Sequence, residues 1–338
     1  MRLSFVYRSF TLTSAAIIAV ILLTMPACAQ NSPTNTSRPI RVGIAWQPSA
    51  DRLNLLISTI EAAGAQPVAL LQMRPACLGY DNDRVSDRYV DTCGIILQQY
   101  ADRIKRDTYH GTPADEIMDS IDAVVFTGGG DISPTLFAQP EPWHGLEADR
   151  NYDAARDASE YLTMAYCLDH DIPALGLCRG MQMLGVISGA TMIQDIPALM
   201  DSLGKTYNYL HRPPHSDNPR THVPHNVTVT SRDSHLWRAV GVDTIRNAPS
   251  WHHQAIRSVS QTPLRVTGTT TDNGVTIIEA VERTDKRWVL GVQFHPETAV
   301  KKHLTGSPDA NRYMTLEEGL AYFRALIRAA RDKNNNKF

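Results

Sequence analysis

Cys178 is the side chain of this sequence best placed for covalent chemistry. It stands in the stretch LGLCRGMQML (175–184), between a short apolar run and residues whose spacing fits one face of a helix. A cysteine at the start of a helix is favoured as a thiolate by the helix dipole, and a thiolate is a nucleophile. A lone cysteine is more often a buried packing residue. The decision between these two roles depends on partner residues elsewhere in the chain.

A base and a residue that orients it are offered by GVQFHPE (291–297), which follows another apolar run. His295 and Glu297 are two residues apart, so both side chains can face the same side of a strand end. A carboxylate beside an imidazole fixes its tautomer and stabilises its charged form. Alone, His-Pro-Glu is equally compatible with a surface turn.

A glycine loop in FTGGGDISP (126–134) could supply the third requirement, which is a set of donors for an oxyanion. Such a loop could instead bind a phosphate. However, it lacks the Gly-Lys-Ser/Thr ending of a nucleotide P-loop and the spacing of a dinucleotide fingerprint. The thiol, the imidazole and the glycines each follow an apolar strand, and open α/β sheets place their sites at such strand ends.

The elements that would position these residues alternate along the chain, which predicts an α/β fold with a mixed sheet. Asp272-Asn273-Gly274 and residues 284–286 are predicted hairpin turns. We predict strands over residues 41–45, 67–71, 123–126, 172–177, 227–230, 264–269, 275–281 and 288–294, and helices over 51–63, 95–106, 153–168 and 316–330.

PALGLCRGMQML together with GVQFHPE resembles the class I glutamine amidotransferase superfamily, and within it the γ-glutamyl hydrolase-like cysteine peptidases. The likeness is greatest to the bacterial γ-glutamyl-γ-aminobutyrate hydrolases. TGGGDISPTLF, Arg156-Asp157-x-x-Glu160, GATMIQDI and WHHQAI point to the same branch, over residues from about 41 to 330. The resemblance implies a three-layer α/β sandwich of flavodoxin-like type, with a central, mostly parallel sheet and an insertion after the second strand.

The resemblance also implies roles for individual residues. Cys178 would be the nucleophile, His295 the general base and Glu297 the carboxylate that orients it. The implied oxyanion donors are backbone N–H groups of Arg179 and of Gly128 or Gly129, and the implied substrate contacts are Gln182, His253 and Gln254. Cleavage of a γ-glutamyl amide would pass through a thioester, with no cofactor and no metal. Two alternatives remain: a glutaminase that supplies ammonia to a synthase, and a non-catalytic binding protein of the same fold.

The sequence departs from the family pattern in two places. Gly189-Ala190 replaces the usual pair of glycines, and Ala248-Pro249-Ser250-Trp251 replaces the usual lead into His-His-Gln. Trp251 could narrow the pocket or serve only for packing. The identity of the leaving amine therefore stays open.

Residues 1–29 have the pattern of a secretory signal peptide, with a basic start, an apolar run and Ala27-Cys28-Ala29. We therefore expect an exported protein, periplasmic or secreted, that begins near Gln30; a lipoprotein anchored at Cys28 is the alternative. Residues 30–39 would be a flexible tether, 40–332 the hydrolase domain and 333–338 a tail. The formal net charge of −2, without basic stripes, favours neither nucleic-acid nor membrane-surface partners. The expected partner is a small γ-glutamyl substrate, and a homodimer stays open.

Residues 74–119 form the insertion and contain Cys77 and Cys93. In an oxidising compartment we expect these two to form a disulfide, leaving Cys167 and Cys178 as free thiols. Two unpaired cysteines are the alternative.

Four histidines crowd a proline-rich loop over residues 211–225. Their irregular spacing and the lack of nearby cysteines argue against a zinc site. We expect the loop to border the active-site cleft, with one or two histidines in its wall: His211, His215, His222 and His225.

Overall fold

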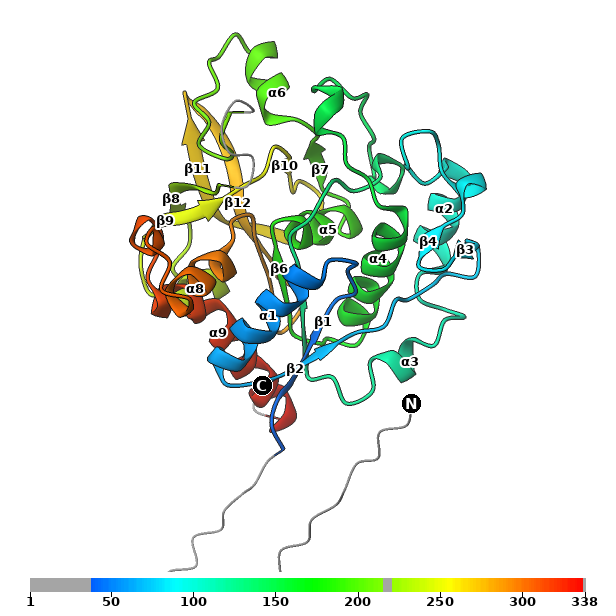
Figure 1. Ribbon diagram of the computed structural model, residues 1–338, viewed down its shortest axis with the longest axis horizontal. Coiled ribbons are helices and arrows are strands. Elements are labelled where there is room, and N and C mark those ends of the chain that lie inside the picture. The colour runs from blue at the N-terminus through cyan, green and yellow to red at the C-terminus, as the bar shows by residue number, and fades with distance from the viewer. Residues whose placement is uncertain (1–37, 215–220, 337–338) are drawn as a thin grey trace, which may run out of the picture. The chain divides into compact units, whose positions relative to one another are not determined.

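A computed structural model describes residues 38–214 and 221–336 (Figure 1). The predicted signal peptide, Cys28 and His215 lie outside these residues. The described residues from Pro39 onward belong to one compact unit.

The main sheet combines a parallel half with an antiparallel half. Its strand order is β2-β1-β5-β6-β13-β12-β11-β8-β9, and neighbours from β2 to β13 are parallel. The pairs from β13 to β9 are antiparallel. In sheet order the bounds are β2 (Gln66–Ala69), β1 (Arg41–Ile44), β5 (Ala123–Phe126), β6 (Ala174–Leu177), β13 (Val289–Val292), β12 (Val275–Arg283), β11 (Leu264–Asp272), β8 (Val223–Val229) and β9 (Thr244–Ser250). The predicted parallel character therefore holds for the central strands that carry the candidate site.

Helices cover both faces of this sheet (Figure 1). One face packs against α1 (Ala50–Ala63), α7 (His235–Val240), α8 (Pro296–Leu304) and α9 (Leu316–Asn334). The other packs against α2 (Gln98–Asp107), α3 (Ala114–Ile117), α4 (Ala154–Asp169) and α5 (Arg179–Ile187). Beyond the sheet, α6 (Ile196–Ser202) packs on a small antiparallel pair of β7 (Thr191–Ile193) and β10 (Ala255–Ser258).

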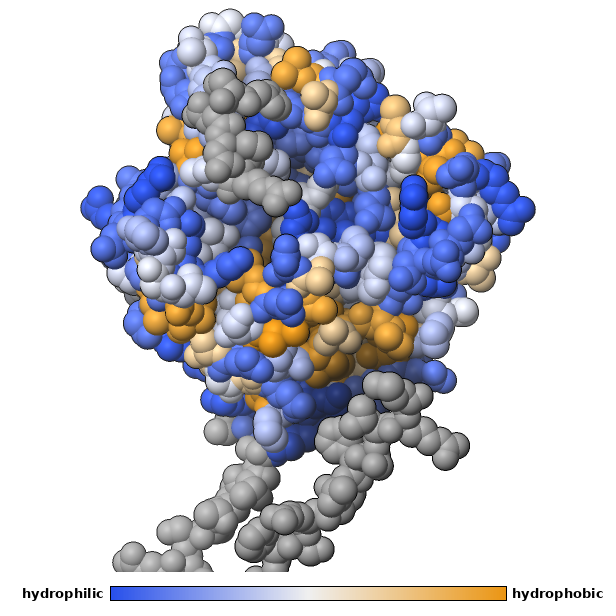
Figure 2. Space-filling view, viewed as in Figure 1, coloured by the Kyte–Doolittle hydropathy of each residue, from blue (hydrophilic) through white to orange (hydrophobic). Residues whose placement is uncertain are grey.

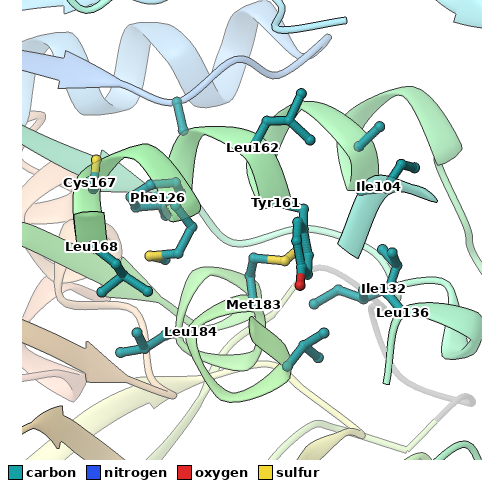
Figure 3. Close-up of a cluster of buried hydrophobic side chains, with 14 of the residues drawn as sticks. Ile104, Phe126, Ile132, Leu136, Tyr161, Leu162, Cys167, Leu168, Met183 and Leu184 are labelled. Atoms are coloured by element: carbon teal, nitrogen blue, oxygen red, sulfur yellow. The ribbon is translucent and has the colours of Figure 1, made fainter. Parts of the chain in front are cut away.

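Strand β5 shows why the sheet lies in the middle. Its residues are fully buried, and they alternate between the two hydrophobic cores: Ala123 and Val125 face one, Val124 and Phe126 the other. Successive side chains of any strand point to opposite faces of the sheet. When the side chains on both faces are apolar and buried, as here, the strand is typical of the centre of a parallel sheet. Figure 3 shows Phe126 in the core formed with α4 and α5. The expected three-layer α/β sandwich is confirmed.

Local signals explain where several elements begin and end. Helix α1 starts after Ser49, whose hydroxyl accepts from the Arg52 N–H, and ends at Gly64 with φ 92°. Asn273 and Gly274, with φ 44° and 82°, form the predicted turn between β11 and β12. Helix α9 continues to Asn334, into the region predicted as a tail.

The insertion at residues 74–119 is an ordered part of the core. It contains β3 (Tyr80–Asp81), β4 (Arg84–Val85), α2 and α3, and its Ile96 and Ile104 are fully buried. The expected disulfide is wrong for this structure: Cys77 and Cys93 are both free. Cys77 is buried near the charged groups of α2, whereas Cys93 lies in an exposed turn whose N–H bonds to Asp91 Oδ1. The two thiols thus lie in different surroundings, one buried and one exposed, and they do not form a disulfide.

The face in Figure 2 is mainly hydrophilic, with hydrophobic side chains in separate patches. Across residues 38–214 and 221–336, we find no helix whose length and apolar content would suit a membrane crossing.

Candidate active site

Three neighbouring strands of the parallel half deliver the residues singled out in the sequence. The glycine loop follows β5, Cys178 follows β6 and His295 follows β13. Because parallel strands end at the same edge of a sheet, these residues converge there.

Cys178 occupies a sharp turn between β6 and α5. Its φ of 50° and ψ of −102° are rare for a residue with a side chain, and its N–H donates to Val292 O at 2.7 Å. A Cβ at Gly180 would lie 2.6 Å from Phe126 O, so only glycine lets the helix start so close to β5. The constrained turn resembles the nucleophile elbow of other hydrolases, which aims the reactive atom away from the sheet.

His295 lies between Cys178 and Glu297. Its Nδ1 is 2.6 Å from Glu297 Oε1, and its Nε2 is therefore the ring nitrogen left for the hydrogen bond with Cys178. Burial disfavours the charged imidazole, but Glu297 and Cys178 outweigh it and raise the pKa of His295 to about 10. At neutral pH the geometry thus favours an imidazolium beside the sulfur.

His222 packs against this imidazole. The two rings meet edge to face, with centroids 5.0 Å apart. Burial, His295 and Lys302 lower the pKa of His222, so it stays neutral. His222 thus packs beside His295, whereas the cavity next to Cys178 is lined by none of the loop histidines that the structure describes.

The glycine loop presents a backbone N–H toward the same space. Gly128 O accepts from Arg156 Nη2 at 2.9 Å and from Arg52 Nη1 at 3.1 Å. In a trans peptide the N–H points opposite to the carbonyl, so the Gly129 N–H is directed away from these guanidinium groups. Gly129 also lines the cavity beside Cys178. The structure therefore favours Gly129 over Gly128 as a donor, while the Arg179 N–H is one of the free donors at the start of α5.

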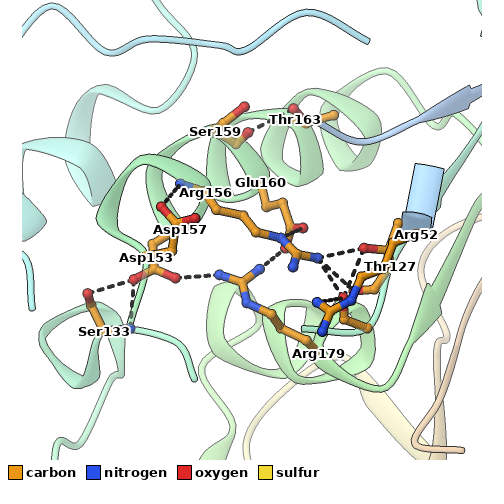
Figure 4. Close-up of polar contacts among 11 residues, drawn as sticks. Arg52, Thr127, Ser133, Asp153, Arg156, Asp157, Ser159, Glu160, Thr163 and Arg179 are labelled. Atoms are coloured by element: carbon orange, nitrogen blue, oxygen red, sulfur yellow. Dashed lines mark hydrogen bonds and ion pairs between the residues drawn. The ribbon is translucent and has the colours of Figure 1, made fainter. Parts of the chain in front are cut away.

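A network of buried charges supports this loop from behind (Figure 4). Arg179 pairs with Asp157 and Glu160, and Arg156 Nε donates to Glu160 Oε1 at 2.7 Å. Asp157 also accepts from the N–H and hydroxyl of Ser133, at 2.9 and 2.6 Å. Burial raises the pKa of Asp157 to about 6, against the opposing effects of Arg179 and Ser133. The side chain of Arg179 is thus a positioning group, and only its backbone faces the site.

A cavity of about 140 Å³ opens beside Cys178, which is small by the standard of pockets for drug-sized ligands. Predicted substrate contacts Gln182, His253 and Gln254 line it. Gln182 Nε2 donates to Gln254 O at 3.1 Å, and within the described chain the buried Gln254 Nε2 has no hydrogen-bond partner. Gln254 therefore offers a donor that a bound molecule could satisfy. The cavity is lined by Gly129, Gly130, Asp131, Ala148, Asp149, Asn151, Cys178, Gln182, Arg212, Trp251, His252, His253 and Gln254.

His253 lies in the wall with both ring nitrogens engaged. Its Nδ1 is 3.0 Å from Asp195 Oδ1 and its Nε2 is 2.9 Å from Asp131 Oδ1. Burial opposes its charge, but the two carboxylates raise its pKa to about 9. His253 can shape the pocket, but neither nitrogen remains for the expected direct contact with substrate.

Sequence reasoning missed a pair of opposite charges at this cavity. Arg212 donates to Asp149 through two bonds, at 2.8 and 2.5 Å. Arg212 belongs to the histidine-rich loop, so its neighbourhood was indicated, whereas no local signal distinguishes Asp149 from other loop carboxylates. A guanidinium and carboxylates in one wall suit a ligand that carries both signs of charge.

Two groups among the described side chains have donor atoms close enough together to hold a metal ion. In the first, Asp149, Asp195 and His253, the carboxylates already contact Arg212 and the charged His253. The second comprises His211, His225 and Glu279.

A family model described as Peptidase C26 matches residues 107–297, a stretch that includes Cys178, His295 and Glu297. The chain belongs to the peptidase C26 family. The family places it among the glutamine amidotransferase-like hydrolases.

Two curated relatives of this peptidase C26 chain carry names that agree with that assignment. "Putative glutamine amidotransferase Rv2859c" of Mycobacterium tuberculosis is 33% identical over 63% of this chain and 57% of its own length. "Putative glutamine amidotransferase PB2B2.05" of Schizosaccharomyces pombe is 29% identical over 57% of this chain and 69% of its own length. A glutamine amidotransferase structure from Thermotoga maritima is 14% identical, with a TM-score of 0.45, covering 88% of this chain and 98% of that one. The chain thus matches little more than half the length of the mycobacterial relative.

Proposed function

We propose that this protein is a cysteine hydrolase that cleaves γ-glutamyl amide bonds through a thioester. The observation that carries the proposal is the contact of His295 with both Cys178 and Glu297, at a strand edge that also holds the Gly129 N–H. A thiol, a base with its orienting carboxylate and an oxyanion donor are the groups that acyl transfer needs.

Each proton in the proposed reaction has a place. The Cys178 thiolate attacks the γ-carbonyl carbon, and the oxyanion is bound by the N–H groups of Gly129 and Arg179. His295 Nε2 gives its proton to the leaving nitrogen as the C–N bond breaks, which leaves a thioester and a neutral imidazole. The imidazole then takes a proton from water as water attacks the thioester. Breakage of the C–S bond releases the γ-carboxylic acid, which loses its proton to solvent, and restores the thiolate–imidazolium pair.

The charges of the cavity support a γ-glutamyl acyl group. Such a group carries an α-carboxylate and an α-ammonium at the end opposite the scissile bond. Arg212 can contact the first, and Asp131 or Asp149 the second, from one wall of the cavity. Trp251 lines the same cavity, and it could contact the leaving amine.

A comparison of three substrates tests the proposal. Purified protein is assayed with γ-glutamyl-γ-aminobutyrate, glutamine and a γ-glutamyl anilide, beside Cys178→Ala and the control Cys93→Ala, which alters an exposed thiol remote in sequence from the site. We expect release of the organic amines, a fall of about a thousandfold or more in Cys178→Ala, and unchanged rates in the control.

The outcomes are distinct. Hydrolysis of glutamine alone would replace the proposal with a glutaminase, and turnover retained by Cys178→Ala would exclude the thioester. A wild-type protein that binds these substrates without cleaving them would be a binding protein of the same fold.

We also propose that residues 1–29 direct export of the enzyme. The support is the basic, apolar and Ala-x-Ala pattern of these residues. N-terminal sequencing of protein from the extracytoplasmic fraction should find a start near Gln30. A lipid-modified Cys28, detected by mass spectrometry, would instead show a membrane-anchored lipoprotein.

A further inference from the structure

We propose that His211, His225, His252 and Glu279 form a binding site for one divalent transition-metal ion of the zinc type. Glu279 lies on β12 and His225 on β8. His252 follows β9, and His211 belongs to the loop between α6 and β8. All four side chains are almost completely buried, with at most 5% exposed. None of them belongs to the proposed reaction.

The distances within the cluster match a shared metal ion. His211 Nδ1 and His252 Nε2 lie 3.1 and 3.6 Å from Glu279 Oε1, and His225 Nε2 lies 3.5 Å from Glu279 Oε2. The donors of His211, His225 and Glu279 all lie within 4.8 Å of one another. Tetrahedral zinc with bonds of about 2.0–2.1 Å separates its ligand atoms by roughly 3.4 Å, which is close to the distances of the three histidines from Glu279. His252 lies outside the group of donors within 4.8 Å of one another, so it would have to move toward the ion to become the fourth ligand.

The donor atoms lack other partners. Within residues 38–214 and 221–336, no hydrogen bond satisfies His211 Nδ1, the Nε2 atoms of His225 and His252, or either carboxylate oxygen of Glu279. Buried polar atoms without partners are costly, and a cluster of them in one place requires an explanation.

In His225 and His252, the contacts of Nδ1, the ring nitrogen that faces away from Glu279, show which nitrogen carries the proton. His225 Nδ1 lies 2.8 Å from Leu210 O, and His252 Nδ1 lies 2.8 Å from Gln254 O. A carbonyl only accepts, so each Nδ1 must donate, and in a neutral ring each Nε2 then directs a lone pair toward the Glu279 carboxylate. Lone pairs that converge in this way repel one another unless a cation lies between them. A backbone carbonyl on the second nitrogen is also the usual arrangement for a metal-bound histidine.

The choice of ion follows from the ligands. Imidazole nitrogens suit zinc and its first-row neighbours, whereas calcium and magnesium prefer sites made of oxygen atoms. Four protein ligands complete a tetrahedral shell, which is typical of a structural rather than a catalytic ion. The ion would join the antiparallel half of the sheet to the segment 251–254, which forms part of the cavity wall.

The spacing of the loop histidines did not predict a zinc site, because only two of them, His211 and His225, belong to the cluster. The remaining ligands, His252 and Glu279, are distant in sequence and meet the loop only when β8, β9 and β12 assemble.

Metal content of the full chain tests the proposal. Protein is freed of metal with a chelator, incubated with Zn²⁺ alone, passed through gel filtration and analysed by mass spectrometry of the elements. We expect about one zinc per chain in the wild type and in His110→Gln, a control at an exposed histidine. His225→Gln and Glu279→Gln should bind zinc at least about a hundredfold more weakly.

Two further measurements, on Cys178→Ala and on the Co²⁺-loaded wild type, show where the metal ion is bound. Cys178→Ala should retain its zinc, because loss there would place the ion on the catalytic thiol. Co²⁺ bound to the wild type should give the intense visible absorption of a four-coordinate ion, a measurement that needs no variant to fold. Absence of retained zinc in the wild type, or equal retention in Glu279→Gln, would overturn the proposal in favour of protonated histidines around Glu279.

Discussion

Two clusters of buried ionisable side chains border the same cavity, and they differ in how completely they are paired. Behind the Gly129 wall, Arg156 and Arg179 pair with Asp157 and Glu160, so two positive and two negative charges balance. Behind the His252 wall, Glu279 faces histidine nitrogens at 3.1–3.6 Å without a hydrogen bond among the described residues. The first cluster is complete as folded, whereas the second is arranged for an added cation.

This difference shows how burial alone can mislead. Both clusters are fully desolvated and both contact pocket-lining residues, yet only one leaves its polar atoms unpaired. A complete network holds a backbone in place, here the Gly128 carbonyl through Arg156. An incomplete one indicates a missing ligand.

The largest effect is expected from opening the complete cluster. Arg179→Met removes the guanidinium and leaves Asp157 and Glu160 partly uncompensated in the interior. Breaking a buried ion pair from one side costs about 3–5 kcal/mol, so the free energy of unfolding, measured in urea, should fall by that amount. An unchanged midpoint and slope would show that the network does not stabilise the fold.

Gly129→Ala should act on catalysis through the same cluster. A Cβ at this position would overlap the Arg156 guanidinium, so the loop must shift and the Gly129 N–H with it. Loss of one oxyanion donor lowers kcat by about 10²–10³-fold. Near-normal kcat in a folded variant would exclude Gly129 as the donor.

Glu297→Gln tests a carboxylate–histidine contact of a different kind, since Glu297 is hydrogen-bonded to His295 at 2.6 Å. The raised pKa of His295, about 10 against 6.5, means that the charged form is favoured in the folded state. Its stabilising contribution is therefore complete below pH 6.5 and is lost as the pH rises through about 10.

In Glu297→Gln burial dominates and the pKa of His295 falls. The loss of unfolding free energy relative to wild type should be largest near pH 6 and shrink toward pH 10. Iodoacetamide should also react more slowly with Cys178 at pH 7, because the variant no longer holds a positively charged imidazolium beside the sulfur. Glu61→Gln, at an exposed glutamate on α1, is the control, and identical pH profiles for both variants would contradict the assigned role.

Local sequence was enough to predict the strands β5 and β6, the helix α4 with Asp153 at its start and the turn at Asn273-Gly274. Each has a short-range cause: an apolar run, a capping side chain or residues that accept positive φ. The motifs around Cys178, His295 and the glycines predicted which strand ends meet. Their proximity depends only on the order of parallel strands, which the alternation of elements already constrains.

What the sequence could not provide depends on contacts between distant segments. His253 contacts Asp195 and Asp131, which are 58 and 122 residues away in the sequence. The Arg212–Asp149 pair and the approach of Glu279 to the histidines also join segments that are distant in sequence. The wrong disulfide has a similar origin. Spacing of 16 residues allowed Cys77 and Cys93 to pair, but packing against α2 buried one thiol and left the other in an exposed turn.

The smallest effect is expected from Glu279→Gln in chelator-treated protein, and it distinguishes the two clusters most directly. A glutamine amide keeps the shape of Glu279 and removes its buried charge. Its NH₂ group can donate to the lone pair of one neighbour, His225 Nε2 or His252 Nε2, which face different oxygens of the carboxylate. Because these atoms are unpaired beforehand, the metal-free variant should unfold within about 1 kcal/mol of the metal-free wild type, in contrast to Arg179→Met. Zinc should then raise the melting temperature of the wild type and leave that of Glu279→Gln unchanged, since only a ligand bound to the folded state stabilises it. A loss of several kcal/mol in the metal-free variant would instead show that Glu279 is already paired with a charged histidine, and the two clusters would then be alike.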